Sequence, residues 1–254
     1  MGDVDKTVSC SRLCKTYGEG EAAVQALRNV SLQLPAGAMT TVIGASGSGK
    51  STLMHCIAGF DSPTSGSSTV AGEQVQTMPA KRIPEFRRSA IGFVFQQHGL
   101  IPILTARENI LLPYRLAGAD PDWDEFDAIV RELDLASRLE HMPSQLSGGQ
   151  RQKVAVARVL LQRPKVVFAD EPTGSLDVKS SDMVLSLLRD KIVRELGITV
   201  VMVTHNISAA MLADHVIALS DGSVILDSPM SAVSRADLES AVSTDSTTAS
   251  GDAE

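Results

Sequence analysis

The stretch VIGASGSGKST, residues 42–52, joins a strand pattern to a helix pattern through a turn rich in glycine and serine. The apolar and β-branched run at 39–43 is typical of a strand. Glycines at 44, 47 and 49 remove the side chains that would keep a backbone from wrapping around a ligand. Because the turn opens into a helix, unpaired N–H groups and the positive dipole end converge on one point. The stretch therefore indicates an anion site.

The spacing of Gly44 from Gly49-Lys50-Ser51 matches the phosphate-binding loop pattern G-x-x-x-x-G-K-[ST]. Lys50 would reach the β- and γ-phosphates of a nucleotide, and the Ser51 hydroxyl would bind Mg²⁺. The alternative is a solvated turn with an incidental lysine, but such a match arises by chance in about one chain per hundred of this length. We therefore expect a phosphate site formed by Gly44, Ser46, Gly47, Ser48, Gly49, Lys50, Ser51 and Thr52.

The composition bounds the class of protein. A chain of 254 residues, 43% of them hydrophobic, can bury one sizeable core. It has no run of about 18 apolar residues and no signal peptide pattern, so we expect a cytoplasmic protein. A net charge of −7 argues against nucleic acid as the main partner. Three cysteines cannot form a disulfide framework, so Cys10, Cys14 and Cys56 are interpreted as reduced packing residues.

Strand and helix patterns alternate along much of the chain. Val30, Leu32 and Leu34 alternate as in a half-buried antiparallel strand, whereas the apolar runs at 166–169 and 198–203 suit buried parallel strands. Asp221-Gly222 indicates a tight hairpin. The segment from about 97 to 162 lacks buried strands and carries helical runs, such as the one expected at 124–133. These features predict an α/β fold with a mostly parallel sheet and a helical insert.

Two acids, Asp170 and Glu171, end the apolar strand at 166–169. Alone they fit a solvated strand-end turn equally well, but beside a phosphate site Asp170 can hold Mg²⁺ and Glu171 can activate the attacking water.

His205 follows the second apolar strand. A histidine there is usually a core or turn residue, yet at the carboxyl edge of the sheet it could contact the γ-phosphate.

The motif LSGGQ, residues 146–150, precedes a helical run at 151–161. Its glycines and serine at a helix N-terminus suit a second anion site, although a flexible hinge is the plainer alternative. Five such letters arise by chance in about a few chains per ten thousand. Here the sequence resembles the ATP-binding-cassette (ABC) family, whose signature is LSGGQ, and the resemblance extends from about Val8 to Val233.

The resemblance implies a role for each matching residue. Residues 44–52 match the Walker A loop, residues 166–171 match Walker B, and residues 175–177 match the D-loop. Gln96 matches the Q-loop glutamine, which contacts Mg²⁺ or the attacking water, and His205 matches the switch histidine. Tyr17 matches the aromatic residue that stacks on adenine, although an ordinary strand-end tyrosine is the alternative. The catalytic set implied is Glu171, His205 and Gln96, and the metal set is Ser51, Gln96 and Asp170.

The resemblance also implies a P-loop NTPase (RecA-like) core with an N-terminal antiparallel β-subdomain and a helical subdomain. The last twelve residues, 243–254, contain no large apolar side chain, so we expect a disordered polar tail there. The resemblance divides a single domain, 1–242, into a core (1–96 and 163–242) and a helical subdomain (97–162). It further implies a head-to-tail homodimer closed by ATP. The residues that would reach the partner's ATP are Ser147, Gly148, Gly149, Gln150 and Asp177.

Family membership leaves three functional classes open: a transporter subunit, a DNA-repair or chromosome ATPase, and a translation factor. The 95 residues between Lys50 and Leu146 hold no heptad array and no C-x-x-C, and only one cassette is present, so we expect the transporter class. The stretches at 17–27, 93–113 and 168–177 are similar to the group that serves macrolide export, lipoprotein release, cell-division signalling, antibiotic-peptide resistance and haem efflux. Ser175 departs from the asparagine that is common there.

The expected function is therefore an ATPase that powers a separate membrane permease, bound peripherally at the inner face of the cell membrane. The polar tail favours a freestanding subunit, and the cargo expected is a toxic amphipathic compound such as haem or an antimicrobial. Lipoprotein release or cell-wall remodelling is the alternative. The apolar run at 100–104 either fills the helical core or forms a groove for a permease helix.

Overall fold

The computed structural model describes residues 7–243, which fall into two compact units. Unit 1 combines the described residues up to 79 with those from 201 onwards, and unit 2 comprises residues 80–200. Unit 2 contains the whole of the segment 97–162. The polar tail expected at 243–254 lies outside the described residues, apart from Ser243.

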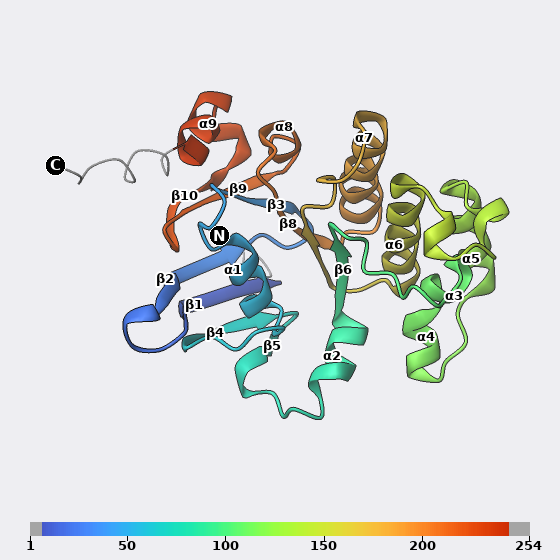
Figure 1. Ribbon diagram of the computed structural model, residues 1–254, viewed down its shortest axis with the longest axis horizontal. Helices are drawn as coiled ribbons and strands as arrows, with labels where there is room; N and C mark the ends of the chain where they lie inside the picture. Colours follow the sequence, from blue (N-terminus) through green and yellow to red (C-terminus); the bar gives the residue numbers. More distant parts are fainter. Residues whose placement is uncertain (1–6, 244–254) are drawn as a thin grey trace. The chain divides into compact units, whose positions relative to one another are not determined.

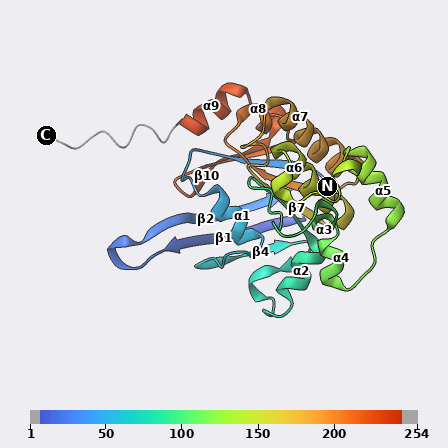
Figure 2. The same cartoon turned by 45° about the vertical axis from the view of Figure 1, so that its right-hand side comes forward.

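Unit 1 begins with an antiparallel sheet. Its strands are β1 (Val8–Tyr17), β2 (Val24–Leu34), β4 (Ser65–Val70) and β5 (Glu73–Gln74), in the order β2-β1-β4-β5. Val8 pairs with Leu34 on one side and with Val70 on the other. Figure 2 shows the long hairpin of β1 and β2 in blue. Val30, Leu32 and Leu34 are all buried, which confirms the alternation predicted from the sequence.

The second part of unit 1 contains parallel and antiparallel pairs of strands. Its elements are β3 (Met39–Ile43), α1 (Lys50–Ile57), α8 (Ile207–Ala210), β9 (His215–Ser220), β10 (Ser223–Pro229) and α9 (Arg235–Ser243). β3 runs parallel to β9, and β9 turns back into β10 at Asp221 and Gly222, so the predicted hairpin is confirmed. Every residue of β3 is buried, and Ile43 packs in one cluster with Ala210 of α8 and Leu238 of α9.

Unit 2 is mainly helical. It contains α2 (Ile83–Ala90), β6 (Ile91–Phe95), α3 (Ala106–Ile110), α4 (Leu112–Ala117), α5 (Trp123–Glu132), α6 (Gly148–Gln162), β7 (Val166–Asp170), α7 (Val178–Ser186) and the π-helix η5 (Leu187–Glu195). β6 and β7 are parallel. The boundary between the units falls inside strand β8 (Thr199–Val203), whose residues are all buried. Residues 97–162 hold no strand, as predicted.

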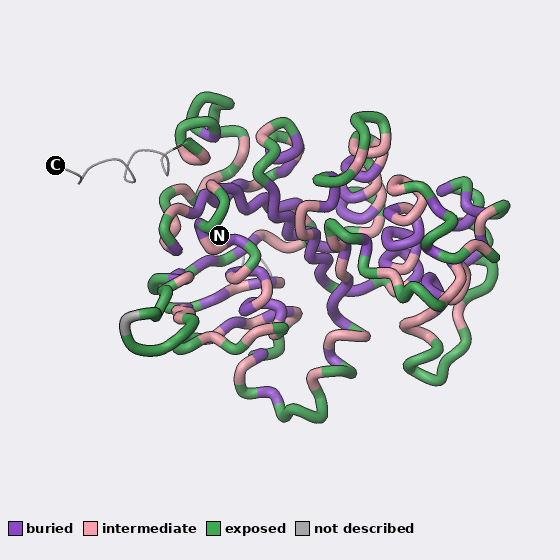
Figure 3. Tube along the Cα trace, in the orientation of Figure 1, coloured by how far each residue is buried: buried purple, intermediate pink, exposed green. Residues whose placement is uncertain are grey.

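Helix α6 is the central element of unit 2: Figure 1 shows it among its neighbours, and in Figure 3 it is largely purple, which marks buried residues. It contacts α3, α4, α5, α7 and β6. Each fully buried valine or leucine of such a helix contributes about 1.5–3 kcal/mol through loss of apolar surface from water. The short 3-10 helices are η1 (Gly20–Ala22), η2 (Val75–Thr77), η3 (Ala136–Arg138), η4 (Pro143–Gln145) and η6 (Met230–Ala232).

The predicted fold class is confirmed: the chain is α/β, with an antiparallel N-terminal sheet and a mostly parallel set of buried strands. Between residues 7 and 243, none of the helices combines the length and apolar character that crossing a bilayer requires.

Candidate nucleotide-binding site

The P-loop, residues 44–52, connects β3 to α1 in unit 1. Gly49 is the N-cap of α1 and has left-handed backbone angles, with φ of 100°. The Leu53 N–H donates to the Gly49 carbonyl at 2.8 Å, which starts the helix directly at the end of the loop. The first N–H groups of α1 therefore face the loop, as an anion site requires.

Two glycines of the loop are sterically required. A Cβ on Gly44 would lie 2.2 Å from the Leu219 carbonyl oxygen, and one on Gly49 would lie 2.4 Å from the Ala26 carbonyl oxygen. Gly47 also has a positive φ of 87°, but a Cβ there would meet nothing within 4 Å. The loop is thus packed against β9 at one end and against β2 at the other.

Lys50 curls back over the loop instead of extending into solvent. Its ammonium Nζ donates to the carbonyl oxygens of Gly44 at 2.9 Å and Ala45 at 2.6 Å, and the residue is only 8% exposed. The positive charge therefore lies inside the ring of backbone that the glycines create. Phosphate oxygens placed there would exchange with the two carbonyls as acceptors.

Tyr17 lies at the end of β1 beside the start of α1. Its hydroxyl donates to Asp61 Oδ2 at 2.7 Å, while the Lys15 ammonium lies 4.7 Å from the ring centroid and 2.6 Å from Asp61 Oδ1. Burial and the bond to Asp61 raise the pKa of Tyr17, and a hydrogen bond with Thr52 lowers it. The structure thus brings Tyr17 next to the last residue of the P-loop, with one ring face towards Lys15 and 43% of the residue exposed.

His205 follows β8 in unit 1 and is exposed. The neighbouring Thr204 donates its N–H to the Val42 carbonyl at 3.2 Å, two residues before the P-loop begins. The strand that carries His205 and the strand that enters the P-loop therefore end at the same level, as expected for neighbouring parallel strands.

Unit 2 brings Gln96 and the two acids together. The parallel register pairs Phe95 with Asp170, so Gln96 and Glu171 are the next residues beyond two adjacent strand ends. The Ser175 hydroxyl donates to the Gln96 carbonyl oxygen at 3.3 Å, which joins the D-loop to the Q-loop. Three motifs that are far apart in the sequence thus share one edge.

Glu171 has a left-handed backbone conformation, with φ of 45°. Such angles are uncommon for residues other than glycine and cost about 1–3 kcal/mol, so the surrounding structure must hold them. One restraint is the Gly174 N–H, which donates to the Glu171 carbonyl at 3.1 Å. No residue pattern around position 171 predicts this conformation.

The signature LSGGQ forms the N-terminus of α6 through a capping box. Gln150 N donates to Ser147 Oγ at 3.2 Å, and Ser147 N donates to Gln150 Oε1 at 2.9 Å. A Cβ on Gly149 would lie 2.7 Å from Ser180 Oγ and 3.2 Å from Ser180 Cβ of α7, so a larger residue there would require the Ser180 side chain to shift. The motif therefore forms a capped helix start in this structure.

Asp177 is the N-cap of α7. Its carboxylate accepts from the Ser180 N–H at 2.9 Å and from the Ser180 hydroxyl at 2.8 Å, and these bonds hold the pKa of Asp177 below its usual range. The same Ser180 lies against Gly149, so the D-loop and the signature meet. Ser180 was missed in the sequence because a serine in the first turn of a helix has no distinguishing pattern.

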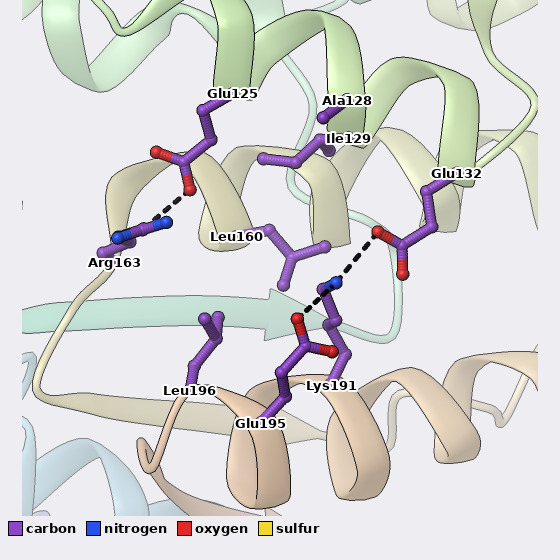
Figure 4. Close-up of a pocket in the computed structure, with 9 residues that line it drawn as sticks. All are labelled: Glu125, Ala128, Ile129, Glu132, Leu160, Arg163, Lys191, Glu195 and Leu196. Carbon is purple, nitrogen blue, oxygen red and sulfur yellow. Dashed lines mark hydrogen bonds and ion pairs between the residues drawn. The ribbon is translucent and has the colours of Figure 1, made fainter.

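A separate hollow of about 250 Å³ lies among α5, α6 and η5. Figure 4 shows that its cations face carboxylates: Arg163 pairs with Glu125 at 2.6 Å, and Lys191 bridges Glu132 and Glu195. The floor is apolar, with Ile129 and Leu160. These ion pairs join three helices, so the hollow is part of the helix packing and offers no unpaired cation to a nucleotide.

The apolar run at 100–104 is largely at the surface. Ile101 is 37% exposed and Ile103 is 81% exposed, whereas Leu100 and Leu104 are half-buried. The Asn109 amide, fully buried, donates to the carbonyls of Ile101 and Leu104, which fixes the run as a turn. Of the two alternatives from the sequence, filling of the core is therefore wrong for Ile101 and Ile103.

The residues present fit a Mg²⁺ ion that is bound mainly through nucleotide phosphates. Between residues 7 and 243, no group of three or more His, Cys, Asp or Glu could hold a metal ion alone. Mg²⁺ typically takes one or two carboxylates together with substrate phosphates. Two candidate ligands, Asp170 and Gln96, lie at adjacent strand ends in unit 2. The third candidate ligand, the Ser51 hydroxyl, belongs to unit 1.

Comparisons with known proteins agree with these motifs. The family described as "ABC transporter" matches residues 27–174. The lipoprotein-releasing system ATP-binding protein LolD of Geobacter metallireducens is 43% identical over 217 residues, covering 85% of this chain and 96% of the relative. The macrolide export ATP-binding/permease protein MacB of Rhodopseudomonas palustris is 44% identical over 91% of this chain, which spans only 35% of that relative.

A solved structure is similar as well. An ATP-binding cassette determined as a dimer in a post-hydrolysis state, bound to ADP and Pi, has a TM-score of 0.80 and 38% identity, covering 88% of this chain and 98% of that chain. The chain therefore belongs to the ABC transporter family, as an ATPase subunit of the group that contains the LolD and MacB ATP-binding proteins.

Proposed function

We propose that the P-loop of this chain binds the phosphates of ATP and that Tyr17 stacks on the adenine. The observation that carries the proposal is the position of the Lys50 ammonium, which is held inside the loop by two carbonyls that phosphate oxygens can replace. Lys15 lies over one face of the Tyr17 ring, and the partial exposure of this residue is compatible with stacking of a base on the other face.

Hydrolysis is assigned to the residues at the strand ends. Glu171 accepts a proton from the attacking water or orients it, and His205 contacts the γ-phosphate. Asp170, Gln96 and Ser51 would hold Mg²⁺, which would neutralise negative charge on the phosphates. The register that pairs Phe95 with Asp170, so that Gln96 and Glu171 follow at adjacent strand ends, supports this division of roles.

The second anion site serves another copy of the chain. Ser147, Gly148, Gly149 and Gln150 present a capped helix start, and Asp177 lies beside them through Ser180. We propose that these residues close over the ATP on the partner's P-loop in a head-to-tail homodimer. The dimeric state of the related cassette supports this arrangement.

The chain would power a separate permease and lie peripherally at the inner face of the cell membrane. LolD, which matches over nearly its whole length, is named as the ATP-binding protein of a lipoprotein-releasing system. The cargo we propose is a toxic amphipathic compound such as haem or an antimicrobial, because the MacB relatives are named for macrolide export. Lipoprotein release or a cell-division role is the second candidate, favoured by the LolD relative.

The nucleotide proposal is tested with the variant Lys50→Ala. Loss of a charged hydrogen-bond donor costs about 1.5–3 kcal/mol, so ATP affinity should fall about ten- to 150-fold. The exposed Lys81→Ala is the matched control and should bind as the wild type does. Isothermal calorimetry gives the affinities, and chelation of Mg²⁺ should abolish ATPase activity. Near-normal affinity in Lys50→Ala, or full turnover in EDTA, would rule the proposal out.

The permease contact is tested at Ile103. Ile103→Asp should fold and hydrolyse ATP normally but fail to co-purify with the permease, because it places a charge on an exposed apolar turn. Ile225→Asp changes another exposed isoleucine, in β10, and should co-purify normally. Normal co-purification of Ile103→Asp would move the contact elsewhere.

A further inference from the structure

A buried chain of hydrogen bonds in unit 2 links the Q-loop, the signature helix and the residue after Glu171. His98 Nδ1 is hydrogen-bonded to Gln152 Oε1, and Gln152 Nε2 donates to the Pro172 carbonyl oxygen at 2.9 Å. Gln152 is 0% exposed and His98 is 6% exposed. His98 lies two residues after Gln96, and Gln152 lies two residues after the signature.

The carbonyl of Pro172 decides which groups donate and which accept in these two hydrogen bonds. The Pro172 carbonyl can only accept, so the amide NH₂ of Gln152 must face it and the amide oxygen must face His98. The His98 ring therefore has to donate from Nδ1–H, whichever state Nε2 is in. Each polar atom in this series of hydrogen bonds then has a matching donor or acceptor. Replacing one side chain leaves the polar group of its neighbour buried without a hydrogen bond.

The two hydrogen bonds of Gln152 connect two strained turns. His98 has φ of 65° and Glu171, which precedes Pro172, has φ of 45°; both are left-handed conformations that favour glycine. Strain of this kind persists only where the surrounding structure holds it. Gln152 supplies a hydrogen bond to the turn at each end, and it does so from the buried face of α6.

Other contacts from the same elements reinforce the Q-loop turn. The His98 N–H donates to the Phe95 carbonyl at 2.9 Å, and the Arg158 guanidinium of α6 donates to the Gly99 carbonyl at 3.0 Å. Burial lowers the pKa of Arg158. The Q-loop turn is thus fixed to α6 at two successive residues, whereas Pro172 is joined to α6 through Gln152.

We propose that Gln152, with His98, is a positioning residue for ATP hydrolysis. It holds Glu171 in its strained conformation and couples that conformation to the position of the Q-loop. The inference rests on the proposed role of Glu171 as the base. Loss of the bond to Pro172 lets the Glu171 backbone relax, and a displacement of the carboxylate by about 1 Å lowers turnover about a hundredfold. ATP binding at the P-loop uses other residues and stays intact.

The test compares two glutamines of α6. Gln152→Leu removes the link, whereas Gln162→Leu removes two hydrogen bonds of the same kind, to the carbonyls of Arg88 at 2.7 Å and Ile91 at 2.8 Å, far from both motifs along the helix. We expect kcat to fall about ten- to hundredfold in Gln152→Leu, with KM for ATP within about twofold, and kcat of Gln162→Leu to stay within about twofold.

A second pair of variants covers the case in which Gln152→Leu does not fold. His98→Phe removes the donor, whereas His98→Asn keeps an N–H near the Nδ1 position and should restore most of the kcat. The inference would be overturned if the two His98 variants had equal kcat, or if the two glutamine variants lost kcat equally. It would also be overturned if kcat of Gln152→Leu stayed within twofold of the wild type. If the wild type itself hydrolyses no ATP, the proposed function fails instead.

Discussion

Gly49→Ala is a direct test of how the P-loop is built. The substitution forces an L-residue into a left-handed conformation with φ of 100°, which costs about 1–2 kcal/mol. It also places a Cβ 2.4 Å from the Ala26 carbonyl oxygen of β2 and 3.2 Å from Leu27 Cδ2. Forcing one extra carbon into a packed site costs about 1–3 kcal/mol more. The expected loss of unfolding free energy is therefore about 2–5 kcal/mol.

Gly47→Ala separates the two contributions. Its φ of 87° is also left-handed, but a Cβ there would meet nothing within 4 Å, so only the conformational cost of about 1–2 kcal/mol should appear. Urea unfolding followed by circular dichroism gives both free energies from the same titration. The difference between the variants, about 1–3 kcal/mol, measures the contact between the loop and β2.

Gly49→Ala should also weaken ATP binding, because Lys50 follows the displaced residue and is held by the loop carbonyls. If Gly49→Ala were no less stable than Gly47→Ala, the result would contradict the close contact between the loop and the Ala26 carbonyl. Unchanged ATP affinity in a destabilised Gly49→Ala would show that phosphate binding does not depend on the loop geometry.

Two further predictions concern side chains near the site. Tyr17→Ala should weaken ATP binding by about 1–3 kcal/mol, whereas Tyr17→Phe, which keeps the ring and loses the hydroxyl's hydrogen bonds with Asp61 and Thr52, should retain most of the affinity; equal effects in calorimetry would exclude stacking. Burial raises the pKa of Cys10 to about 12 and of Cys56 to about 11, so at pH 8 a maleimide should label Cys56 about a hundredfold and Cys10 about a thousandfold more slowly in the native than in the unfolded protein. Because both pKa values are raised, this contribution to stability is complete below about pH 8.5 and declines as pH rises to about 11 and 12. Equal labelling rates would contradict the burial.

The parts of the site that could be predicted from the sequence are governed by local interactions. The P-loop spacing, the strand before it and the capping box of LSGGQ each involve residues a few positions apart. Helix α5 was expected at 124–133 and begins one residue earlier, because Asp122 caps it by accepting from the N–H groups of Asp124 and Glu125. Boundary shifts of this size arise because capping depends on side-chain geometry.

The features that could not be predicted depend on contacts between distant residues. Asp61 joins Tyr17 across 44 positions, and Gln152 reaches His98 across 54. A signal for Gln152 did exist, since a polar side chain occupies a position three residues before the buried Ala155 of α6 and so falls on its apolar face. The left-handed conformation of Glu171 left no mark in the sequence, because glutamate has no special preference for it.

The central claim is that Glu171 is the base in an ATP site completed by a second copy of the chain, and Glu171→Gln tests both parts at once. The glutamine keeps the size of the side chain and cannot take a proton, so ATP turnover should fall about 10²–10⁴-fold while ATP still binds. Size-exclusion chromatography with light scattering in saturating Mg²⁺ and ATP should then show a dimer that returns to monomer when ATP is removed. A variant that turns over ATP at the wild-type rate, or that stays monomeric in saturating ATP, would contradict the account.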